Sequence, residues 1–195
     1  MARVFSKKQI ERYASPQRIA ALGRLVTETL NAHPRVQWLE SPYVQLFVCQ
    51  NFISDEDCDL LIDMIDSDSQ PSTLYEGTER ETICDLMGLP QSHSEVLQGQ
   101  RYQVGQQFKD HHDYFHETEK YWQYEGPNGG QRTWTAMAYL NEPEKGGATA
   151  FPQLQYQVEP RRGMLLIWNN MSRDGTPNID TLHAGTAVEQ GAKFI

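Results

Sequence analysis

The sequence has no long apolar segment, few cysteines and a deficit of basic residues. No apolar run approaches the ~20 residues that a membrane-spanning helix needs. The three cysteines, Cys49, Cys58 and Cys84, are scattered and form no C-x-x-C pair, so neither a zinc knuckle nor a disulfide framework is predicted. Lys and Arg number 17 against 26 Asp and Glu, and the net charge of −9 disfavours nucleic acid or an anionic membrane as a partner.

Internal repeats, low-complexity linkers and a secretory signal are also missing. The first residues, MARVFSKKQIERYA, are charged throughout and lack the apolar stretch of a signal peptide. Together with the unpaired thiols, this predicts a soluble cytoplasmic protein. The 195 residues suffice for one domain with a sizeable core, so we expect a single domain over 1–195.

Helical patterns occupy the N-terminal part of the chain. Ser15-Pro16 suits a helix start, and apolar residues then follow at helical spacing: Ile19, Leu22, Val26 and Leu30. Ser54 suits the start of a second helix, whose predicted buried face is Cys58, Leu61, Ile62 and Ile65. Between them, residues 43–52 (YVQLFVCQNF) predict a strand.

From about residue 80 the pattern changes to short strand-like segments separated by Gly, Pro and Asn. The segments are 81–87, 100–108, 132–141, 146–151, 156–160, 163–169, 181–188 and 192–195. Such spacing is typical of an antiparallel sandwich or barrel. We therefore expect a helical layer with the first strands over 1–98 and a β-rich half over 99–195 that carries the chemistry.

A metal site is predicted around FKDHHDYF, residues 108–115. In an extended segment, residues i and i+2 share a face, so His111 and Asp113 converge while His112 points away. His183, in the late segment TLHAG, is the better third ligand than His33, His93 or His116. Two histidines and one carboxylate leave coordination positions open, as is typical of non-haem Fe(II), although zinc accepts the same ligands.

Lys193 follows His183 by ten residues and lies beside apolar Phe194 and Ile195. The strand pattern should return this lysine to the vicinity of the metal strand. A lysine held in an apolar pocket needs an anionic partner because its desolvation is costly. A dicarboxylic acid co-substrate would provide one.

Several motifs then occur in order along residues 99–195. The segment Tyr102-x-x-Gly105-Gln106-x-Phe108-x-x-His111-x-Asp113-x-Phe115 resembles the first metal-binding strand of the prolyl 4-hydroxylase group of 2-oxoglutarate- and Fe(II)-dependent dioxygenases. GGQRTWTAMAYLNEPEKGGATAFP (129–152), V-x-P-x-x-G (158–163) and IWN (167–169) are similar to later parts of that pattern. H-A-G-x-x-V-x-x-G-x-K, from His183 to Lys193, is similar to its closing motif.

The resemblance implies a mainly β fold, a double-stranded β-helix (a cupin-like jelly-roll) supported by N-terminal helices. It implies that His111, Asp113 and His183 bind Fe(II), and that Lys193 pairs with the distal carboxylate of 2-oxoglutarate. Tyr102 and Thr149 would lie near that co-substrate. Alternation along 132–141 sends Thr135, Met137 and Tyr139 to one face, which we interpret as the pocket wall. Arg132 would lie near a peptide substrate.

The implied reaction is hydroxylation of a C–H bond by O₂, with release of succinate and CO₂ and with ascorbate as a possible auxiliary. Prolyl 4-hydroxylation of a peptide or protein is the first hypothesis. The alternatives are hydroxylation of a free amino acid or other small molecule, a zinc hydrolase, and a non-catalytic jelly-roll binding module. A peptide substrate favours an open groove beside Arg132, whereas a small molecule favours a closed cavity.

Overall fold

A computed structural model of the chain describes residues 15–67, 73–75 and 78–195. The charged first segment, residues 1–14, lies outside the described residues. The helices are α2 (Pro16–Ala32), α3 (Asp55–Ser67), α4 (Thr78–Met87) and α5 (Trp122–Asn128), with 3-10 turns η1 (Gln91–His93), η2 (Pro152–Leu154) and η3 (Ile179–Thr181). The strands are β1 (Val36–Leu39), β2 (Leu46–Cys49), β3 (Thr73–Tyr75), β4 (Leu97–Gly99), β5 (Arg101–Gln103), β6 (Phe108–His111), β7 (Trp134–Tyr139), β8 (Lys145–Gly146), β9 (Thr149–Phe151), β10 (Tyr156–Val158), β11 (Met164–Asn169), β12 (His183–Gly185), β13 (Val188–Gln190) and β14 (Ala192–Phe194).

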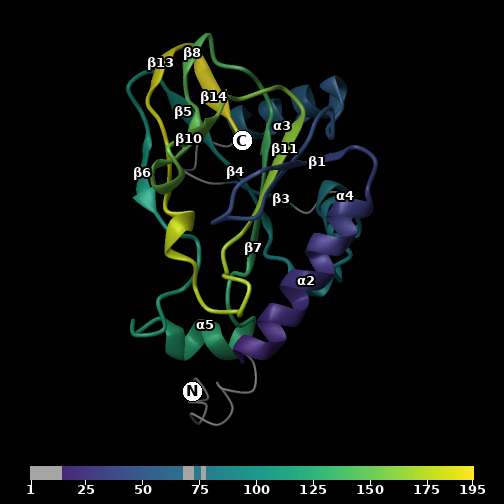
Figure 1. Cartoon of the computed structure of the whole chain (residues 1–195). Coiled ribbons are helices and arrows are strands. Elements are labelled where there is room, and N and C mark those ends of the chain that lie inside the picture. The colour runs from purple at the N-terminus through teal and green to yellow at the C-terminus, as the bar shows by residue number, and fades with distance from the viewer. Residues whose placement is uncertain (1–14, 68–72, 76–77) are drawn as a thin grey trace, which may run out of the picture.

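The strands form two antiparallel four-stranded sheets with three smaller strand pairs (Figure 1). One sheet has the order β1-β2-β11-β7 and the other β10-β9-β12-β6. The pairs are β13 with β8, β14 with β5, and β3 with β4. Most neighbouring strands are distant in sequence, as in a jelly-roll. The predicted fold class, a mainly β jelly-roll with supporting helices, is confirmed.

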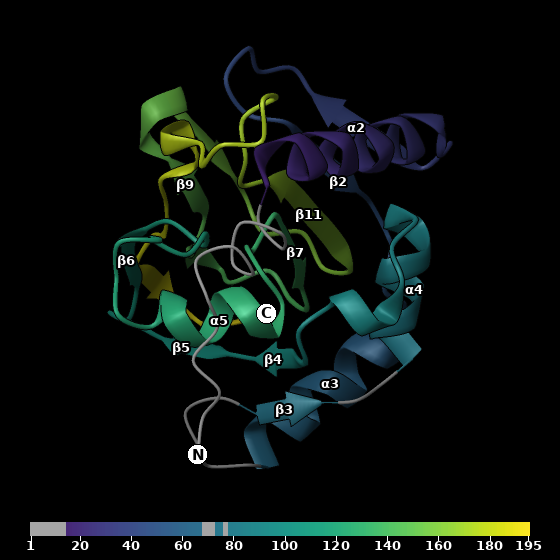
Figure 2. The same ribbon diagram turned by 90° about the horizontal axis from the view of Figure 1, so that it is seen from below.

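The sheet containing β11 is buried on both faces, and alternation along its strands divides the core into two parts. Met164, Leu166 and Trp168 face the jelly-roll interior, where they pack against Tyr139 and Phe151. Leu165 and Ile167 face the opposite side, where Val26 and Leu30 of α2 cover them. In Figure 2, α2 lies across β2 and β11. Burying each such side chain contributes about 1.5–3 kcal/mol, so α2 is an integral layer of the fold.

Both predicted helix starts are confirmed. Ser15 caps α2, and its side chain accepts a hydrogen bond from the Arg18 amide. Ser54 precedes α3 and accepts a hydrogen bond from the Asp57 amide. The predicted apolar face of α3 is also observed: Cys58 is buried, and Leu61, Ile62 and Ile65 pack around it.

The prediction of a strand at residues 81–87 is wrong, because this segment belongs to α4. Its apolar residues Ile83, Leu86 and Met87 have the i, i+3, i+4 spacing of a helix and pack against the α2 side of the sheet. Strands β1, β3 and β4 and the short helix α5 were not predicted; β1 pairs with β2, and β3 pairs with β4. Among the described residues, no helix has both the length and the apolar character to cross a bilayer.

Candidate active site

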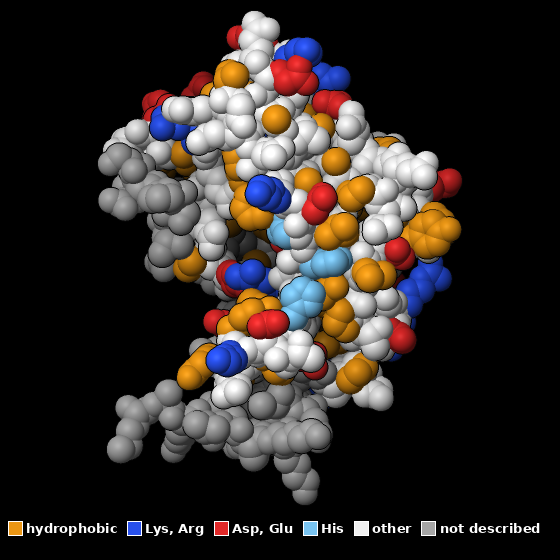
Figure 3. All heavy atoms as spheres, turned by 90° about the vertical axis from the view of Figure 1, so that its left-hand side faces the viewer, with side chains coloured by type: hydrophobic (Ala, Val, Ile, Leu, Met, Phe, Trp, Pro, Cys, Tyr) orange, Lys and Arg blue, Asp and Glu red, His pale blue; other side chains and the backbone are white. Residues whose placement is uncertain are grey.

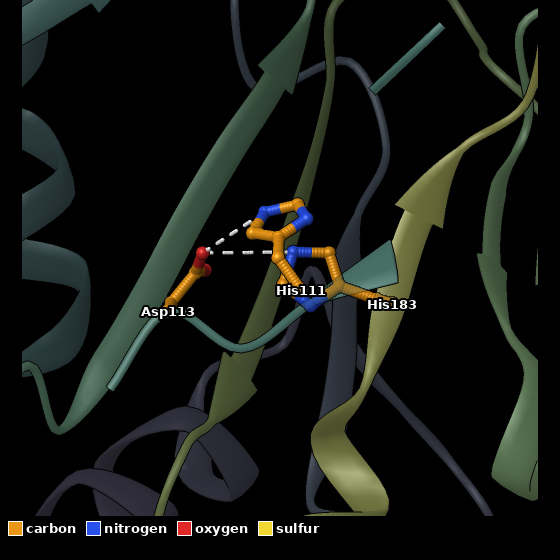
Figure 4. Close-up of side chains that lie close together, drawn as sticks. All are labelled: His111, Asp113 and His183. Carbon is orange, nitrogen blue, oxygen red and sulfur yellow. Dashed lines mark ion pairs between the residues drawn. The ribbon is translucent and has the colours of Figure 1, made fainter. Parts of the chain in front are cut away.

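The pairing of β6 with β12 brings two predicted ligands together. His111 and His183 are direct cross-strand partners in this antiparallel pair, a position at which side chains on one face lie about 5 Å apart. Their ring centroids are 4.2 Å apart. Strand β6 ends at His111, so Asp113 lies in the bend that follows rather than in a regular strand. The bend still turns the Asp113 carboxylate toward both imidazoles (Figure 4).

His111, Asp113 and His183 each direct one atom that could bind a metal toward the same point. Asp113 Oδ1 lies 3.3 Å from His111 Nε2 and 3.6 Å from His183 Nε2. His111 Nδ1 donates to the Lys109 carbonyl at 2.8 Å and His183 Nδ1 to the Thr181 carbonyl at 2.9 Å. Because these carbonyls hold a proton on Nδ1, each ring in its neutral form offers its Nε2 lone pair to a metal at this point. In the metal-free protein burial opposes the charge on His111, but hydrogen bonds to Asp113 and to the Lys109 carbonyl raise the pKa of this ring, which when protonated donates from Nε2 to Asp113.

The ionisation of these groups suits a cation. Burial opposes the charge on Asp113, but hydrogen bonds from His111 and Thr135 and the nearby imidazoles keep the pKa of its carboxyl below the ordinary value. Burial lowers the pKa of His183, which keeps that ring neutral. One ligand atom from each of the three residues lies within 4.8 Å of the others. A carboxylate with two neutral imidazoles is the donor set of a facial triad, so the residues present fit Fe(II).

Lys193 lies in a closed part of the jelly-roll beside this triad. Its register partner across the β14–β5 pair is Tyr102. The side chain is only 3% exposed, and Nζ lies 5.3 Å from the Tyr139 ring centroid and 5.8 Å from that of Tyr102. No ion pair joins it to a carboxylate of the described residues. Burial alone lowers the pKa of Lys193 to about 8, so this ammonium lacks the anion that it needs.

Two glycines provide the space around the lysine stem. A Cβ atom on Gly147 would lie 3.4 Å from Lys193 Cδ and 3.0 Å from Pro143 Cγ, and Gly147 also has a φ of +77°. A Cβ atom on Gly185 would lie 3.9 Å from Lys193 Nζ. Gly185 belongs to β12, the strand of His183, so the lysine and the triad are adjacent.

Tyr139 and Thr149 form a second polar group in this part of the interior. The buried Tyr139 hydroxyl donates to Thr149 Oγ1 at 2.7 Å, and burial raises the pKa of this phenol far above its ordinary value. Tyr139 is therefore a neutral donor. Because Thr149 accepts from it, the single hydroxyl proton of Thr149 is available for an anionic oxygen.

Tyr102 lies beside Lys193 but has its hydroxyl engaged by another residue. Its hydroxyl donates to the side-chain carbonyl of Gln100, so the proton is directed away from the lysine. Toward the pocket Tyr102 presents its ring, over which the Lys193 ammonium lies.

Arg132 lies at the rim of the site. Its guanidinium stacks 4.5 Å above the Phe115 ring and donates from Nε and Nη2 to the Glu95 carboxylate at 2.6 and 3.0 Å. Asp113 contributes to the charge environment of this guanidinium. The side chain is 42% exposed, which places a cation at the solvent edge of the triad.

The other histidines lie apart from the triad. His112 points toward the Ile179 carbonyl, to which its Nε2 lies at 3.0 Å, and it stacks on Tyr114. His116 packs against Tyr114 in turn. In Figure 3, histidine side chains gather beside a hollow on the face that carries β6. Three residues with a role around the site were missed: Glu95, Thr135 as a hydrogen-bond partner of Asp113, and Asn170 beyond it. The alternation that sent Thr135 inward could have indicated the second, whereas no pattern indicates the other two.

Comparisons with known proteins agree with this geometry. Residues 97–195 match the 2OG-Fe(II) oxygenase superfamily. Probable prolyl 4-hydroxylase 3 of Arabidopsis thaliana is 28% identical over 94% of this chain and 76% of its own length. Prolyl 4-hydroxylase subunit alpha-2 of Caenorhabditis elegans is 36% identical over 58% of this chain, which spans only 21% of that protein.

Solved structures share the fold. The viral collagen prolyl hydroxylase of Paramecium bursaria chlorella virus 1, in its 2OG complex, has a TM-score of 0.61 at 24% identity, covering 76% of this chain and 91% of its own. A Pseudomonas putida prolyl-4-hydroxylase has a TM-score of 0.50 at 16% identity, with 90% of each chain covered. With the family match over half of the sequence, the conclusion is that this chain belongs to the 2OG-Fe(II) oxygenase superfamily and is an Fe(II)- and 2-oxoglutarate-dependent dioxygenase.

Proposed function

We propose that this enzyme hydroxylates prolyl residues in a peptide or protein. The reaction consumes peptidyl proline, O₂ and 2-oxoglutarate and yields peptidyl hydroxyproline, succinate and CO₂. One oxygen atom enters the proline C–H bond and the other enters succinate, so the two-electron oxidation of each organic substrate balances the four-electron reduction of O₂.

The observation that carries the proposal is the graded exposure of the triad. The side chain of His183 is 6% exposed, that of Asp113 20% and that of His111 30%. The site is therefore closed toward Lys193 and open toward solvent, where Arg132 lies at the rim. A polypeptide can reach an open site of this kind, whereas a free amino acid is better held in a closed cavity.

The roles of the chain's own residues follow from this arrangement. Bound Fe(II) supplies the redox chemistry of O₂ activation, and His111, Asp113 and His183 would hold it. Lys193 anchors the distal carboxylate of 2-oxoglutarate as a point charge in a largely apolar pocket, and Thr149 donates its hydroxyl proton to the same co-substrate. The surrounding apolar core, with Phe151 and Trp168 against His183, excludes water from the reacting side.

Arg132 is the proposed contact for the peptide. Glu95 and the Phe115 ring fix its guanidinium, and Nε and Nη2 are engaged by the carboxylate. Nη1 remains to donate to a backbone carbonyl of the substrate. The names of the relatives support a prolyl substrate, and family membership leaves the zinc hydrolase and the non-catalytic binding module without support.

The test is anaerobic reconstitution with Fe(II) and 2-oxoglutarate, followed by O₂ and a panel of proline-containing peptides. Mass spectrometry should show a gain of one oxygen on proline, with succinate formed in equal amount. Asp113→Ala serves as the matched inactive control. If only free proline or another small molecule gains oxygen, the peptide substrate is wrong and the small-molecule alternative replaces it.

Ascorbate forms a separate part of the proposal. We expect it to extend turnover by reducing iron that has oxidised in cycles without substrate. Succinate formation should then continue for longer with ascorbate present than without it, at an unchanged initial rate. An unchanged time course would remove ascorbate from the proposal.

A further inference from the structure

We propose that Asn170 is a positioning residue for the metal site and that it acts on Asp113 through Thr135. This inference rests on the assignment of Asp113 as an Fe(II) ligand. Three side chains from three segments form a continuous hydrogen-bonded chain. Asn170 Nδ2 donates to Thr135 Oγ1 at 2.9 Å, and Thr135 Oγ1 donates to Asp113 Oδ2 at 2.6 Å.

The direction of these two hydrogen bonds follows from the number of protons that each group carries. An amide NH₂ group can only donate, so Thr135 must accept from Asn170. The hydroxyl of Thr135 has one proton, and that proton is then committed to the carboxylate. Without Asn170, the hydroxyl could rotate its proton elsewhere. Asn170 therefore determines that the ionised Asp113 receives a donor.

Asp113 depends on this bond because the backbone around it is irregular. Strand β6 ends at His111, so ladder hydrogen bonds do not fix the orientation of the Asp113 side chain. With Oδ2 held by Thr135, only Oδ1 faces the two Nε2 atoms. The carboxylate is thus presented through one oxygen, which leaves room in the coordination sphere for 2-oxoglutarate and O₂.

Asn170 is itself rigidly held. It follows β11, it is fully buried, its amide donates to the Thr133 carbonyl at 2.8 Å, and its carbonyl accepts from the Asn178 amide at 3.0 Å. Thr135 lies on β7, whose register with β11 pairs it with Trp168. Asn170 is therefore held by the sheet, and the sheet orients Asp113 through the side chains of Asn170 and Thr135.

The unpaired side-chain oxygen of Asn170 indicates that this residue is not present for stability alone. Oδ1 is buried and has no hydrogen-bond partner among the described residues. Leaving a buried acceptor unpaired destabilises a fold, whereas an apolar side chain of the same shape avoids that cost. An asparagine at this position is therefore explained by its donor.

The neighbouring Asn169 provides a matched control. It is also buried, but both ends of its side chain are paired: Nδ2 donates to Gln45 Oε1 at 2.8 Å, and Oδ1 accepts from the Met171 amide at 2.9 Å. It faces α2, where a Cβ atom on Gly23 would lie 3.2 Å from its Nδ2. Asn169 therefore stabilises the fold without a link to Asp113, whereas Asn170 is linked to Asp113 through Thr135.

The experiment measures Co(II) binding by calorimetry and visible absorption, together with the melting temperature of the metal-free protein. Asn170→Leu should weaken Co(II) binding by about tenfold, the lower end for outer-shell partners, with an unchanged or raised melting temperature. Asn169→Leu should show the opposite pattern, with a melting temperature lower by several degrees and Co(II) affinity within about twofold of wild type, because its lost hydrogen bonds lie outside the metal site.

A double-mutant cycle tests the route through Thr135. Thr135→Val should weaken Co(II) binding to a similar extent, Thr135→Ser should restore it, and Asn170→Leu should have no further effect in the Thr135→Val background. The inference would be overturned if Asn170→Leu weakened Co(II) binding equally in the wild-type and Thr135→Val proteins, or if it left the Co(II) affinity unchanged. Either result would leave the proposed function intact. Failure of the wild-type protein to bind Co(II) would instead overturn the metal site and the proposed function with it.

Discussion

The buried lysine offers the sharpest test of the 2-oxoglutarate site. We expect Lys193→Met to weaken 2-oxoglutarate binding about a hundredfold at pH 7. Methionine keeps the length of the apolar stem and its contacts with the Tyr102 and Tyr139 rings, so the substitution removes the charge and little volume. Lys193→Ala would also create a cavity and is less informative.

The magnitude follows from the state of Lys193 in the protein without 2-oxoglutarate. Burial lowers its pKa from an ordinary 10.5 to about 8, which corresponds to a desolvation cost of about 3 kcal/mol at 1.36 kcal/mol per pH unit. A diacid that pairs with the ammonium offsets this cost. Losing the pair leaves a carboxylate buried without a partner, a loss on the order of 3 kcal/mol, and 1.4 kcal/mol per decade converts it to about a hundredfold.

The same reasoning predicts an opposite effect on stability. Below pH 8 the lysine is charged in both the folded and the unfolded chain, so the desolvation cost is fully present; it decreases as the pH rises from about 8 to 10.5. Lys193→Met should therefore raise the free energy of unfolding of the ligand-free protein at pH 7 by up to about 3 kcal/mol. Urea unfolding and calorimetric titration of 2-oxoglutarate measure the two quantities. A variant with unchanged 2-oxoglutarate affinity would refute the anchoring role.

Three further predictions concern pH, the metal ligands and the rim. Above pH 8 Lys193 loses its proton in the ligand-free protein but keeps it in the complex with 2-oxoglutarate, so the dissociation constant of 2-oxoglutarate should rise by up to about tenfold per pH unit in wild type. Calorimetry should find that this constant does not change with pH in Lys193→Met. A constant value in wild type would contradict the pairing. Asp113→Ala should abolish peptide-dependent succinate formation while His112→Ala largely spares it, and the reverse result would show that the ligand assignment is out of register. Glu95→Gln should raise the KM for the peptide by no more than about fivefold, because an exposed ion pair contributes at most about 1 kcal/mol. The affinity for 2-oxoglutarate should stay unchanged. A lower peptide KM would mean that Glu95 competes with the peptide for Arg132.

The sequence predicted most of the local structure because local rules govern it. Ser15 and Ser54 were identifiable as helix starts from capping chemistry, and the inward face of β7 followed from simple alternation. Residues 81–87 were assigned to the wrong element because a short apolar segment fits both a strand and a helix. Only packing against α2 shows that its apolar residues form one helical face.

The sequence by itself determined which residue types were available for the chemistry: an H-x-D pair, a later histidine and a lysine between apolar neighbours. The tertiary structure decided how they meet. The β6–β12 register places His183 opposite His111, and the β14–β5 register places Lys193 opposite Tyr102. The hydrogen bonds from Asn170 to Thr135 and from Thr135 to Asp113 join segments that no local pattern relates. Strand pairing between distant segments depends on the whole core, so neither spacing nor periodicity reveals it.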